Sequence, residues 1–456
     1  MTLLGACAIP SPAGKVGKRK LAPDRGANET AEGDPRMKIA IVGTGIAGLT
    51  AAYHLYEQHD ITVFEQNGYI GGHANTVAVR DGEREIGLDT GFIVYNETTY
   101  PHFTRLLKAL HVPTQLSEMS FSVQCDCCAL EYCGRSIRGL FARGDQLLRP
   151  RFYRMLWEVF RFNRLGAAAL RAPIPADRTL GDFLRQHHFS REFVRHYVTP
   201  MASAIWSMST ADAGAFPLEF FLRFFANHGL LSVANQPAWR TITGGSRRYV
   251  AALTKPFADR IQLKRPVRSV RRHAGGVKLG FDGGATQSFD RLVLAAHADQ
   301  ALAMLTDPSD AEARALGALR YQQNEAVLHT DHRLLPRNRH AWASWNYHMV
   351  DCERIGSPLP MTYYLNCLQQ LDATRPYCVT LNDSGCIRPE CVIKRIPYEH
   401  PLFTADSLRA QAELNRLNGQ RHTYFCGAYL GFGFHEDGAK AGLAAAEALT
   451  AGRAAA

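Results

Sequence analysis

The sequence of 456 residues lacks any apolar run of about 18 residues, the length that a helix needs to cross a bilayer. Its most apolar stretch, residues 216–231, contains Glu219, Arg223 and His228, which are costly to bury in lipid. Internal repeats are absent as well. The composition, with 46% apolar and 21% charged residues, excludes global disorder, and the length predicts two or three domains.

Paired CxxC motifs and a regular cysteine spacing are also missing. The 11 cysteines are odd in number, which argues against a disulfide framework and for a reducing compartment, so we expect a cytoplasmic protein. Four of them, Cys125, Cys127, Cys128 and Cys133, lie in the segment SFSVQCDCCALEYCG, which alternates like a strand and hairpin. We therefore expect these thiols to lie along a strand, and we predict no metal site.

Acidic residues are fewer than basic ones, which gives a formal net charge of +10. Between Arg135 and Arg195 there are thirteen Arg against five Asp or Glu. Within this region Arg151–Leu165 is expected to form an amphipathic helix. Its predicted apolar face comprises Phe152, Met155, Leu156, Val159 and Phe160. Two interpretations stay open, a peripheral contact with the inner face of an anionic membrane or packing on the protein's own core. No motif indicates nucleic-acid binding.

The first structured segment combines a strand, a glycine-rich turn and a helix. Lys38–Val42 is a predicted strand, and Gly43-Thr44-Gly45-Ile46-Ala47-Gly48 leads into a helix that ends near Gln58. In this GxGxxG pattern the glycines permit a tight turn, a close approach of the backbone to a diphosphate, and packing of the helix on the strand. The helix N-terminus favours bound phosphates.

An acidic residue completes this pattern. Glu65 lies 22 residues after Gly43, at the end of a second predicted strand, Ile61–Phe64. A carboxylate at this position accepts hydrogen bonds from the ribose hydroxyls and repels a 2′-phosphate. The sequence therefore predicts a dinucleotide site on an α/β, Rossmann-type fold, with NADP disfavoured.

The pattern of elements along the chain predicts interleaved domains. Strands are expected again at residues 261–295, 361–366 and 423–426, and a last helix at Asp437–Leu449, whereas residues 95–235 are mostly helical and aromatic-rich. We predict a disordered tail at 1–36, a discontinuous cofactor-binding domain at 37–94, 236–305 and 405–451, and a mixed α+β substrate domain at 95–235 and 306–404.

Two further motifs resemble a known family. The segments are Gly71-Gly72-His73-Ala74-Asn75-Thr76 with Leu88-Asp89-Thr90-Gly91-Phe92, and Cys426-Gly427 with Gly433-Phe434-His435-Glu436. Together with the first unit they resemble the flavin-containing amine oxidase superfamily, which includes monoamine oxidases and phytoene desaturases. The resemblance covers roughly residues 37 to 450. It implies non-covalent FAD and an FAD-dependent oxidoreductase.

A narrower resemblance rests on central segments. They are Asn227-His228-Gly229-Leu230-Leu231, Trp239-Arg240-Thr241 and Gly244-Gly245-Ser246-Arg247. These are similar to bacterial amine-oxidase-like NAD/FAD-binding oxidoreductases, which are related to the amino-terminal flavin domain of plant cyclopropane fatty acid synthases. That relationship suggests lipid acyl chains as substrates.

The resemblance also implies which residues contact the cofactor. In the family the last helix faces the flavin with its N-terminus, and the strand that contains Val267 contacts adenine with its backbone. His73 stands where amine oxidases commonly carry Arg. The expected cofactor-binding residues are Gly43, Gly45, Ile46, Ala47, Gly48, Glu65, Gln66, Gly71, Gly72, His73, Thr76, Asp89, Thr90, Gly91, Phe92, Val267, Gly427, Phe434, His435 and Glu436.

The implied reaction is the removal of a hydride from the substrate to flavin N5. Many amine-oxidising relatives use a lysine near N5, and no lysine after residue 250 stands in an aromatic segment of this chain. We therefore favour an apolar, lipid-like or fatty-acyl-like substrate. The alternatives are a small-amine or amino-acid oxidase and a non-catalytic flavin-binding partner of a lipid-modifying enzyme. Candidate catalytic residues are His435, His228 and Trp239, which bring polar groups into aromatic surroundings.

Overall fold

The computed structural model describes residues 36–208, 211–232, 237–353, 360–383 and 385–454. Residues 37–456 form one compact unit. The tail predicted for residues 1–36 lies, apart from Arg36, outside the described residues. The division of the compact unit into a cofactor domain and a substrate domain stays a prediction.

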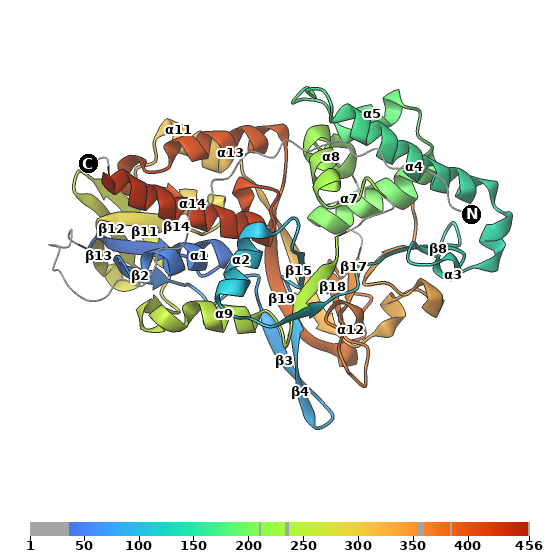
Figure 1. Cartoon of the computed structure of the whole chain (residues 1–456), viewed down its shortest axis with the longest axis horizontal. Coiled ribbons are helices and arrows are strands. Elements are labelled where there is room, and N and C mark those ends of the chain that lie inside the picture. The colour runs from blue at the N-terminus through green and yellow to red at the C-terminus, as the bar shows by residue number, and fades with distance from the viewer. Residues whose placement is uncertain (1–35, 209–210, 233–236, 354–359, 384, 455–456) are drawn as a thin grey trace, which may run out of the picture. The chain divides into compact units, whose positions relative to one another are not determined.

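A five-stranded parallel sheet forms the framework near the glycine-rich turn (Figure 1). Its order is β10-β2-β1-β14-β20, so the chain leaves the central strand β1 first towards one edge and later towards the other. The strands are β1 (Lys38–Val42), β2 (Asp60–Phe64), β10 (Ile261–Gln262), β14 (Arg291–Leu294) and β20 (Thr423–Phe425). Such a reversal of order opens a crevice at the carboxyl ends of the strands. The strands predicted at these positions are confirmed.

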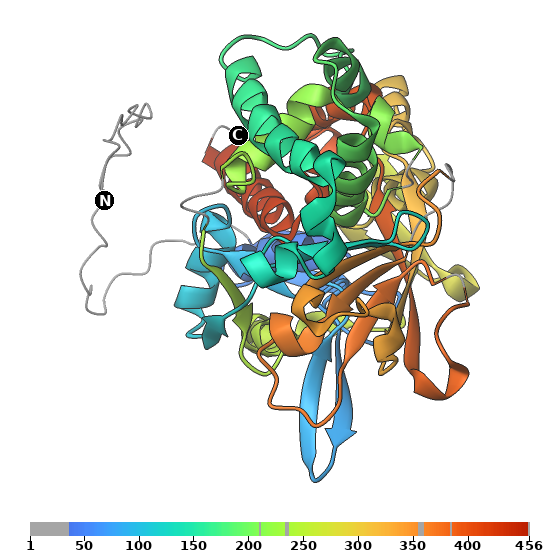
Figure 2. The same ribbon diagram turned by 90° about the vertical axis from the view of Figure 1, so that its right-hand side faces the viewer.

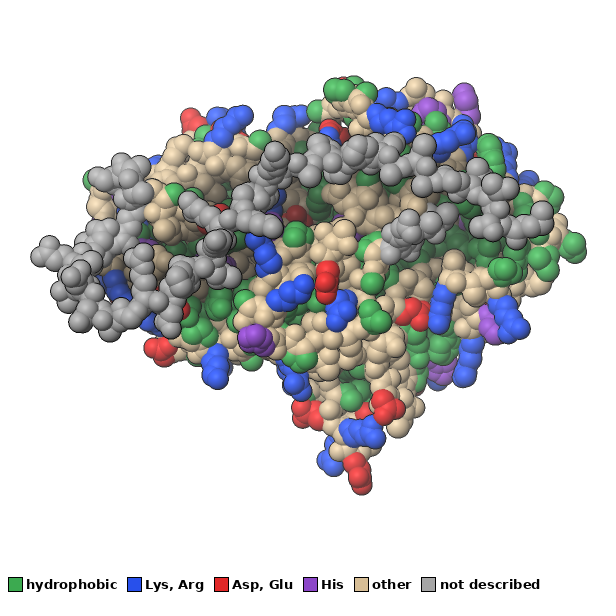
Figure 3. All heavy atoms as spheres, in the orientation of Figure 1, with side chains coloured by type: hydrophobic (Ala, Val, Ile, Leu, Met, Phe, Trp, Pro, Cys, Tyr) green, Lys and Arg blue, Asp and Glu red, His purple; other side chains and the backbone are tan. Residues whose placement is uncertain are grey.

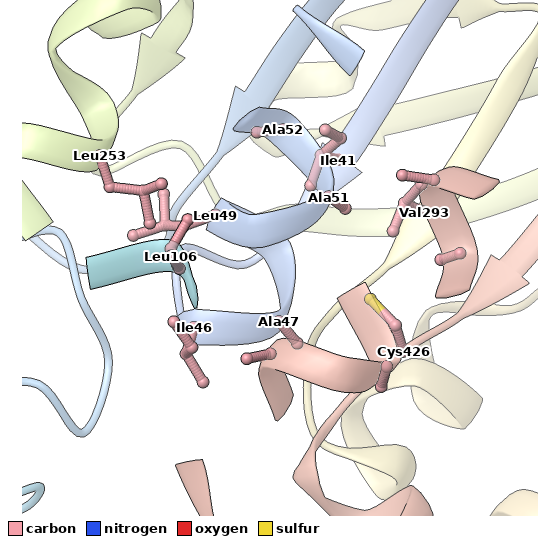
Figure 4. Packing of buried hydrophobic residues seen from close by; sticks show 14 of the residues in the cluster. Ile41, Ile46, Ala47, Leu49, Ala51, Ala52, Leu106, Leu253, Val293 and Cys426 are labelled. Carbon is pink, nitrogen blue, oxygen red and sulfur yellow. The ribbon is translucent and has the colours of Figure 1, made fainter. Parts of the chain in front are cut away.

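The two faces of this sheet are covered by different elements, because alternate residues of a strand point to opposite sides. Ile39 and Ile41 pack with helices α1 (Ile46–Leu55) and α14 (His435–Ala454), as Figure 4 shows for Ile41. Ala40 and Val42 belong to the opposite core. That core contains the meander β11 (Val267–His273), β12 (Gly276–Phe281) and β13 (Thr286–Phe289), and helices α10 (Ala298–Met304), α11 (Asp310–Gly317) and α13 (Ala405–Leu417).

Helices α1 and α14 lie in unusually close contact. A Cβ atom at Gly442 would lie 2.2 Å from the Ala47 carbonyl oxygen, and one at Gly438 would lie 2.6 Å from Cγ2 of Ile46. These distances leave no room for a methyl group, so the contact requires glycine on α14. The contact fixes the beginning of α14 beside the beginning of α1.

A second sheet of seven strands has the order β19-β15-β18-β17-β16-β7-β8. Its strands are β7 (Phe121–Cys125), β8 (Leu130–Cys133), β15 (Tyr321–His329), β16 (Trp345–Met349), β17 (Met361–Tyr364), β18 (Cys378–Leu381) and β19 (Val392–Pro401). Neighbouring strands are antiparallel except for the parallel pair β7 and β16. The hairpin predicted around Cys125–Cys133 is confirmed as β7 and β8.

Helices cover one side of this sheet, at the upper right of Figure 1 and the top of Figure 2. They are α4 (Pro150–Ala169), α5 (Leu180–Gln186), α6 (Arg191–Phe193), α7 (Thr199–Trp206) and α8 (Leu218–Asn227). Their shared core is aromatic and includes Phe162, Phe183, Phe193, Phe221 and Phe225. The helical prediction for residues 95–235 missed two three-residue strands, β5 (Val94–Asn96) and β6 (Thr114–Leu116), which flank β9 (Trp239–Ile242). Strands so short show no sequence alternation.

The predicted apolar face of α4 is partly wrong. Phe152 and Met155 are buried as expected, but Phe160 is 57% exposed and Phe162 takes the buried place. The helix has three different surroundings: Phe162 packs in the protein core, Val159 lines a cavity, and Phe160 is exposed to solvent. The prediction assumed one apolar face and one polar face, so it did not allow for apolar residues on the cavity side and on the solvent side. Among the described residues, no helix is long and apolar enough to cross a membrane.

The contact between α1 and α14 yields a stability prediction. We expect Gly442→Ala to lower the free energy of unfolding by about 1–3 kcal/mol, because the added methyl group overlaps the Ala47 carbonyl. Urea denaturation followed by circular dichroism measures the change. The matched control is Gly144→Ala, whose Cβ meets no atom within 4 Å and should change stability little. Equal stability of the two variants would contradict the close contact.

Candidate active site

A cavity of about 1610 Å³ opens at the carboxyl edge of the parallel sheet. Residues that follow the strands line it: Gly43 after β1, Glu65 after β2, Ala295 after β14 and Gly427 just beyond β20. Ligand pockets usually measure about 300–1,000 Å³. The cavity therefore has room for a dinucleotide together with a second molecule.

The glycine-rich turn after β1 forms one wall. Gly43 has φ of 107°, and a Cβ there would lie 2.7 Å from the Ala295 carbonyl oxygen. A Cβ at Gly48 would lie 2.0 Å from the Gly43 carbonyl oxygen, so this glycine allows helix α1 to pack on the turn. Gly45 differs, because its Cβ would meet nothing within 4 Å. It lines the cavity, which leaves space for a phosphate against its backbone.

Glu65 lies at the nucleotide end of the cavity, and its side chain is buried. The backbone N–H and the hydroxyl of Thr44 donate hydrogen bonds to Oε2, at 3.0 and 2.5 Å. The backbone N–H of Asn67 donates to Oε1 at 2.9 Å. The side-chain amide of Asn67 also donates to Oε1, at 3.0 Å, so each oxygen accepts two hydrogen bonds and the carboxylate is firmly held. A ribose hydroxyl would donate to this carboxylate in place of the Thr44 hydroxyl or the Asn67 amide.

The N-terminus of α14 forms a further part of the wall, beside the glycine-rich turn. Phe434, which precedes the helix, and His435, its first residue, line the cavity. The carboxylate of Glu436 turns away from the cavity and accepts hydrogen bonds from the backbone N–H groups of His102 and Phe103 at the start of α2 (Pro101–Ala109), both at 3.0 Å. Only the backbone of Glu436 is therefore left to serve a ligand. The unpaired N–H groups of this helix end suit a ligand that gains negative charge.

Most of the predicted cofactor-binding residues line the cavity. These are Gly43, Gly45, Ile46, Ala47, Glu65, Gln66, Gly71, Gly72, His73, Thr90, Gly91, Phe92, Val267, Gly427, Phe434 and His435. Four others, Gly48, Thr76, Asp89 and Glu436, are not among the lining residues. Gly48 acts through packing, and the side chains of the other three bind protein groups instead.

Asp89 and Thr76 form a buried network behind the cavity wall. They belong to β4 (Arg84–Asp89) and β3 (Thr76–Asp81), a hairpin that projects downward in Figures 1 and 2. The Thr76 hydroxyl donates to Oδ1 of Asp89 at 2.5 Å, and the Ser246 backbone N–H donates to both carboxylate oxygens at 2.9 and 3.0 Å. Burial raises the pKa of Asp89 to about 6. The direct cofactor contact predicted for these two side chains is corrected to a positioning role.

The candidate catalytic residue His435 is packed rather than free. Its ring stacks on Phe92, with centroids 3.7 Å apart, and its Nε2 lies 2.7 Å from the Tyr249 hydroxyl. Burial lowers the pKa of His435 to about 3, so protonation of the imidazole is strongly disfavoured. The side chain is therefore a poor base, and the geometry favours a packing role.

His228 and Trp239 both line the cavity, and their rings stack with centroids 6.2 Å apart. Nδ1 of His228 donates to the Phe224 carbonyl at 3.0 Å, which leaves Nε2 as a hydrogen-bond acceptor. Burial lowers the pKa of His228 to about 4, so the ring is neutral at physiological pH. Of the three candidates, His228 has the geometry that best suits contact with a substrate.

Sequence reasoning missed a histidine cluster on the cavity wall. His73 stacks on Tyr398 with centroids 4.6 Å apart, and its centroid lies 5.3 Å from that of His400 and 6.4 Å from that of His297. All four residues line the cavity. Nε2 of His73 is buried without a hydrogen-bond partner, and burial lowers the pKa of His73 well below its usual value. The sequence held one indication of this cluster: His297 follows β14 closely, and ligands bind at the carboxyl ends of parallel strands.

The other end of the cavity is apolar. We call it the apolar chamber, defined by Val159, Met201, Ala204, Ile205, Trp206 and Phe224. Two polar atoms are buried here without a partner, Oδ1 of Asn163 and Nε1 of Trp206. Lys394 also lines the cavity, but from an exposed position on β19 rather than within this chamber.

The donor groups of the cavity fit FAD. The nucleotide end offers an open glycine turn and a positioned carboxylate, and the α14 end offers unpaired backbone N–H groups. His73 and Tyr429 also line the cavity, and each has a buried polar atom without a hydrogen-bond partner, Nε2 of His73 and the hydroxyl of Tyr429. Such buried polar atoms are costly unless a ligand satisfies them.

Asp437, in the first turn of α14, gives a prediction of pH dependence. Burial raises the pKa of its carboxyl from 3.8 to about 6, and the carboxylate accepts from the Phe434 N–H at 2.9 Å. Between these pH values the folded chain keeps a proton that the unfolded chain has lost. The free energy of unfolding should therefore fall, by about 3 kcal/mol for this group, as the pH rises through this window.

Asp437→Asn should remove this contribution, because the amide does not ionise but still offers an acceptor oxygen. Urea denaturation of the holoprotein at several pH values between about 4 and 7 measures it. Between about pH 4 and 6 the slope of the unfolding free energy against pH should be more positive for Asp437→Asn than for wild type, and it should be unchanged for the exposed control Asp259→Asn. Parallel slopes for wild type and Asp437→Asn would contradict the raised pKa.

Residues 46–357 match the family described as flavin containing amine oxidoreductase. The zeta-carotene desaturase of Solanum lycopersicum is 37% identical over 76 residues, which are 16% of this chain and 12% of that relative. The chain therefore aligns with only a small part of the relative's length.

Solved structures are similar over most of the chain. Cyclohexylamine oxidase from Brevibacterium oxydans IH-35A has a TM-score of 0.65 at 16% identity and covers 91% of this chain and 100% of its own. The CLA-producing fatty acid isomerase from P. acnes has a TM-score of 0.61 at 15% identity, with 91% and 98% covered. At such identities the similarity shows the shared fold. The family match over residues 46–357 establishes that this chain belongs to the flavin-containing amine oxidoreductase family, and the geometry of the cavity fits the FAD of that family.

Proposed function

We propose that this oxidoreductase removes hydride from an apolar, lipid-like or fatty-acyl-like substrate held in the apolar chamber. The observation behind the proposal is that one continuous cavity joins the dinucleotide end to a wall of aliphatic and aromatic side chains. Burial of apolar surface is the main driving force for binding a hydrocarbon chain. The similarities to a carotene desaturase and to a fatty acid isomerase support the same substrate class.

The chain's own residues would orient both molecules. The turn at Gly43–Gly48, with Glu65, would hold the diphosphate and ribose, and the start of α14 would face the flavin ring. FAD supplies the hydride acceptor when bound. Trp239 and Phe224 would exclude water around the reacting carbon, and neutral His228 would accept a hydrogen bond through Nε2.

Oxidation of a small amine is the second candidate, because cyclohexylamine oxidase shares the fold. The described residues favour it less. Of the lysines after residue 250, only Lys394 lines the cavity among the described residues, and it is exposed.

An anaerobic reduction experiment tests this proposal. Membrane lipid extract should bleach the visible flavin band of the wild-type holoprotein, whereas simple amines should not. Met201→Glu should slow the bleaching at least about tenfold, because it places a carboxylate in the apolar chamber. The control Glu413→Gln, whose side chain on α13 is 42% exposed, should react like wild type. Bleaching by amines alone would favour the amine oxidase, and no bleaching by any reductant would favour a non-catalytic flavin protein.

We further propose that the protein docks peripherally on an anionic membrane through α4 and its neighbours α3 (Ile137–Leu140) and Gly144–Leu148. Ile137, Leu148, Trp157 and Phe160 are 80%, 86%, 60% and 57% exposed. Exposed arginines lie between these residues or just after them in sequence, namely Arg138, Arg151, Arg154 and Arg164. Figure 3 shows green and blue side chains near each other at the right-hand rim, over the end where Figure 1 labels α3 and α4. Exposed aromatic groups with flanking cations suit an anionic bilayer surface.

Vesicle sedimentation tests the docking proposal. We expect binding to phosphatidylserine-containing vesicles, and binding about tenfold weaker for the double variant Trp157→Ala/Phe160→Ala, which removes two exposed apolar groups. The control Leu116→Ala/Ile393→Ala removes exposed apolar groups elsewhere, 62% and 38% exposed, and should bind like wild type. Equal binding of all three proteins would contradict the docking surface.

A further inference from the structure

The turn of the β7–β8 hairpin gathers cysteines from two distant segments. Cys125 ends β7, and Cys127 and Cys128 lie in the turn. Parallel pairing places Cys125 opposite Met349 at the end of β16, and the Cys127 backbone N–H donates to the Val350 carbonyl at 3.2 Å. This pairing brings Cys352, which follows β16, to the same turn.

The four sulfur atoms lie close together without forming disulfides. Sγ of Cys128 and Sγ of Cys352 are 3.3 Å apart, and Sγ of Cys127 lies 3.3 Å from that of Cys125 and 3.4 Å from that of Cys352. A disulfide bond would measure about 2.05 Å. Thiolates bound to one tetrahedral zinc ion, each with a Zn–S bond of about 2.3 Å, are separated by a little under 4 Å. The observed sulfur–sulfur distances of 3.3–3.4 Å are closer to the separation around a zinc ion than to a disulfide bond.

A buried histidine completes the group. His196 lies in the π-helical turn Val194–Val198, which connects α6 to α7. Its Nδ1 donates to the Glu192 carbonyl at 3.2 Å, while its Nε2 is buried without any hydrogen-bond partner. The ligand atoms of His196, Cys125, Cys128 and Cys352 all lie within 4.8 Å of one another. An imidazole fixed through one nitrogen, with the other left vacant, has the usual orientation of a metal ligand.

We propose that Cys125, Cys128, Cys352 and His196 form a tetrahedral site for a structural zinc ion. Zinc binding displaces one proton from each of the three thiols to solvent, and it satisfies the vacant Nε2. Three thiolates leave the site with one net negative charge. Arg149 supports the turn, since its Nη1 donates to the Cys128 carbonyl at 2.8 Å and its Nη2 pairs with Asp145. Cys127, the exposed fourth thiol, accepts a hydrogen bond from the Cys352 backbone N–H at 3.3 Å.

All four coordination positions come from protein side chains, so the site is structural rather than catalytic. The ion would tie the ends of the neighbouring strands β7 and β16 to the helical turn before α7. Met201, Ala204 and Ile205 of α7 line the apolar chamber. The zinc site would therefore fix one wall of that chamber, although the proposal does not depend on the identity of the substrate.

Zinc content and X-ray absorption of the FAD-loaded full chain test the proposal. We expect about one zinc per chain, with three sulfur ligands at about 2.3 Å and one nitrogen ligand at about 2.0 Å. Cys128→Ser and Cys352→Ser should retain less than about a tenth of the metal. Cys127→Ser and Cys391→Ser, which change an adjacent and a distant thiol, should keep it.

Several results would overturn the site. One such result is wild-type protein that contains no zinc although it was produced with ample zinc. Another is a disulfide between Cys128 and Cys352, detected by peptide mapping. Zinc kept by His196→Gln and lost by Cys127→Ser would overturn the assignment of His196. If the serine variants fail to fold, treating wild type with an organomercurial should release zinc to a coloured chelator and lower its melting temperature. Absence of any release would count against the site.

Discussion

The close contact between α1 and α14 is the constraint on which the active site depends. Because Gly438 and Gly442 have no side chains, the backbone of α14 lies directly against α1. Gly48 in turn lets α1 pack on the turn that precedes it. Both helices then begin at the same edge of the parallel sheet. Because each helix N-terminus presents unpaired N–H groups, this contact places two electropositive ends around one elongated ligand.

The substrate side of the cavity is built on a different principle. Its walls come from aromatic packing between α4, α7 and α8, where few hydrogen bonds direct the side chains. Polar groups here are few, and His228 is one whose tautomer is fixed by a backbone carbonyl. Along its length the cavity thus changes from walls that offer directional hydrogen bonds to walls that offer only shape and apolar surface. This change suits a polar dinucleotide at one end and the proposed apolar substrate at the other.

The cofactor half could be predicted from sequence because its signals are local. The glycine turn and Glu65 lie within one strand–helix–strand unit, and the residue types alone define their chemistry. His297 and His400 meet His73 only through the fold, and Cys352 lies more than two hundred residues from Cys128. No periodicity connects such positions. The motifs did not show that the side chains of Asp89 and Glu436 bind protein groups, because a motif shows which residues are near a ligand but not where each side chain points.

Adjacent residues of α4 face different media, since Val159 lines the cavity and Phe160 is exposed. An α-helix with its side chains is about 10–12 Å across. If this helix lies on a bilayer, a hydrocarbon molecule could move from the acyl region to the flavin by crossing the width of a single helix. The low solubility of this molecule in water would then not limit turnover. The rate of turnover would depend instead on the concentration of the molecule in the membrane.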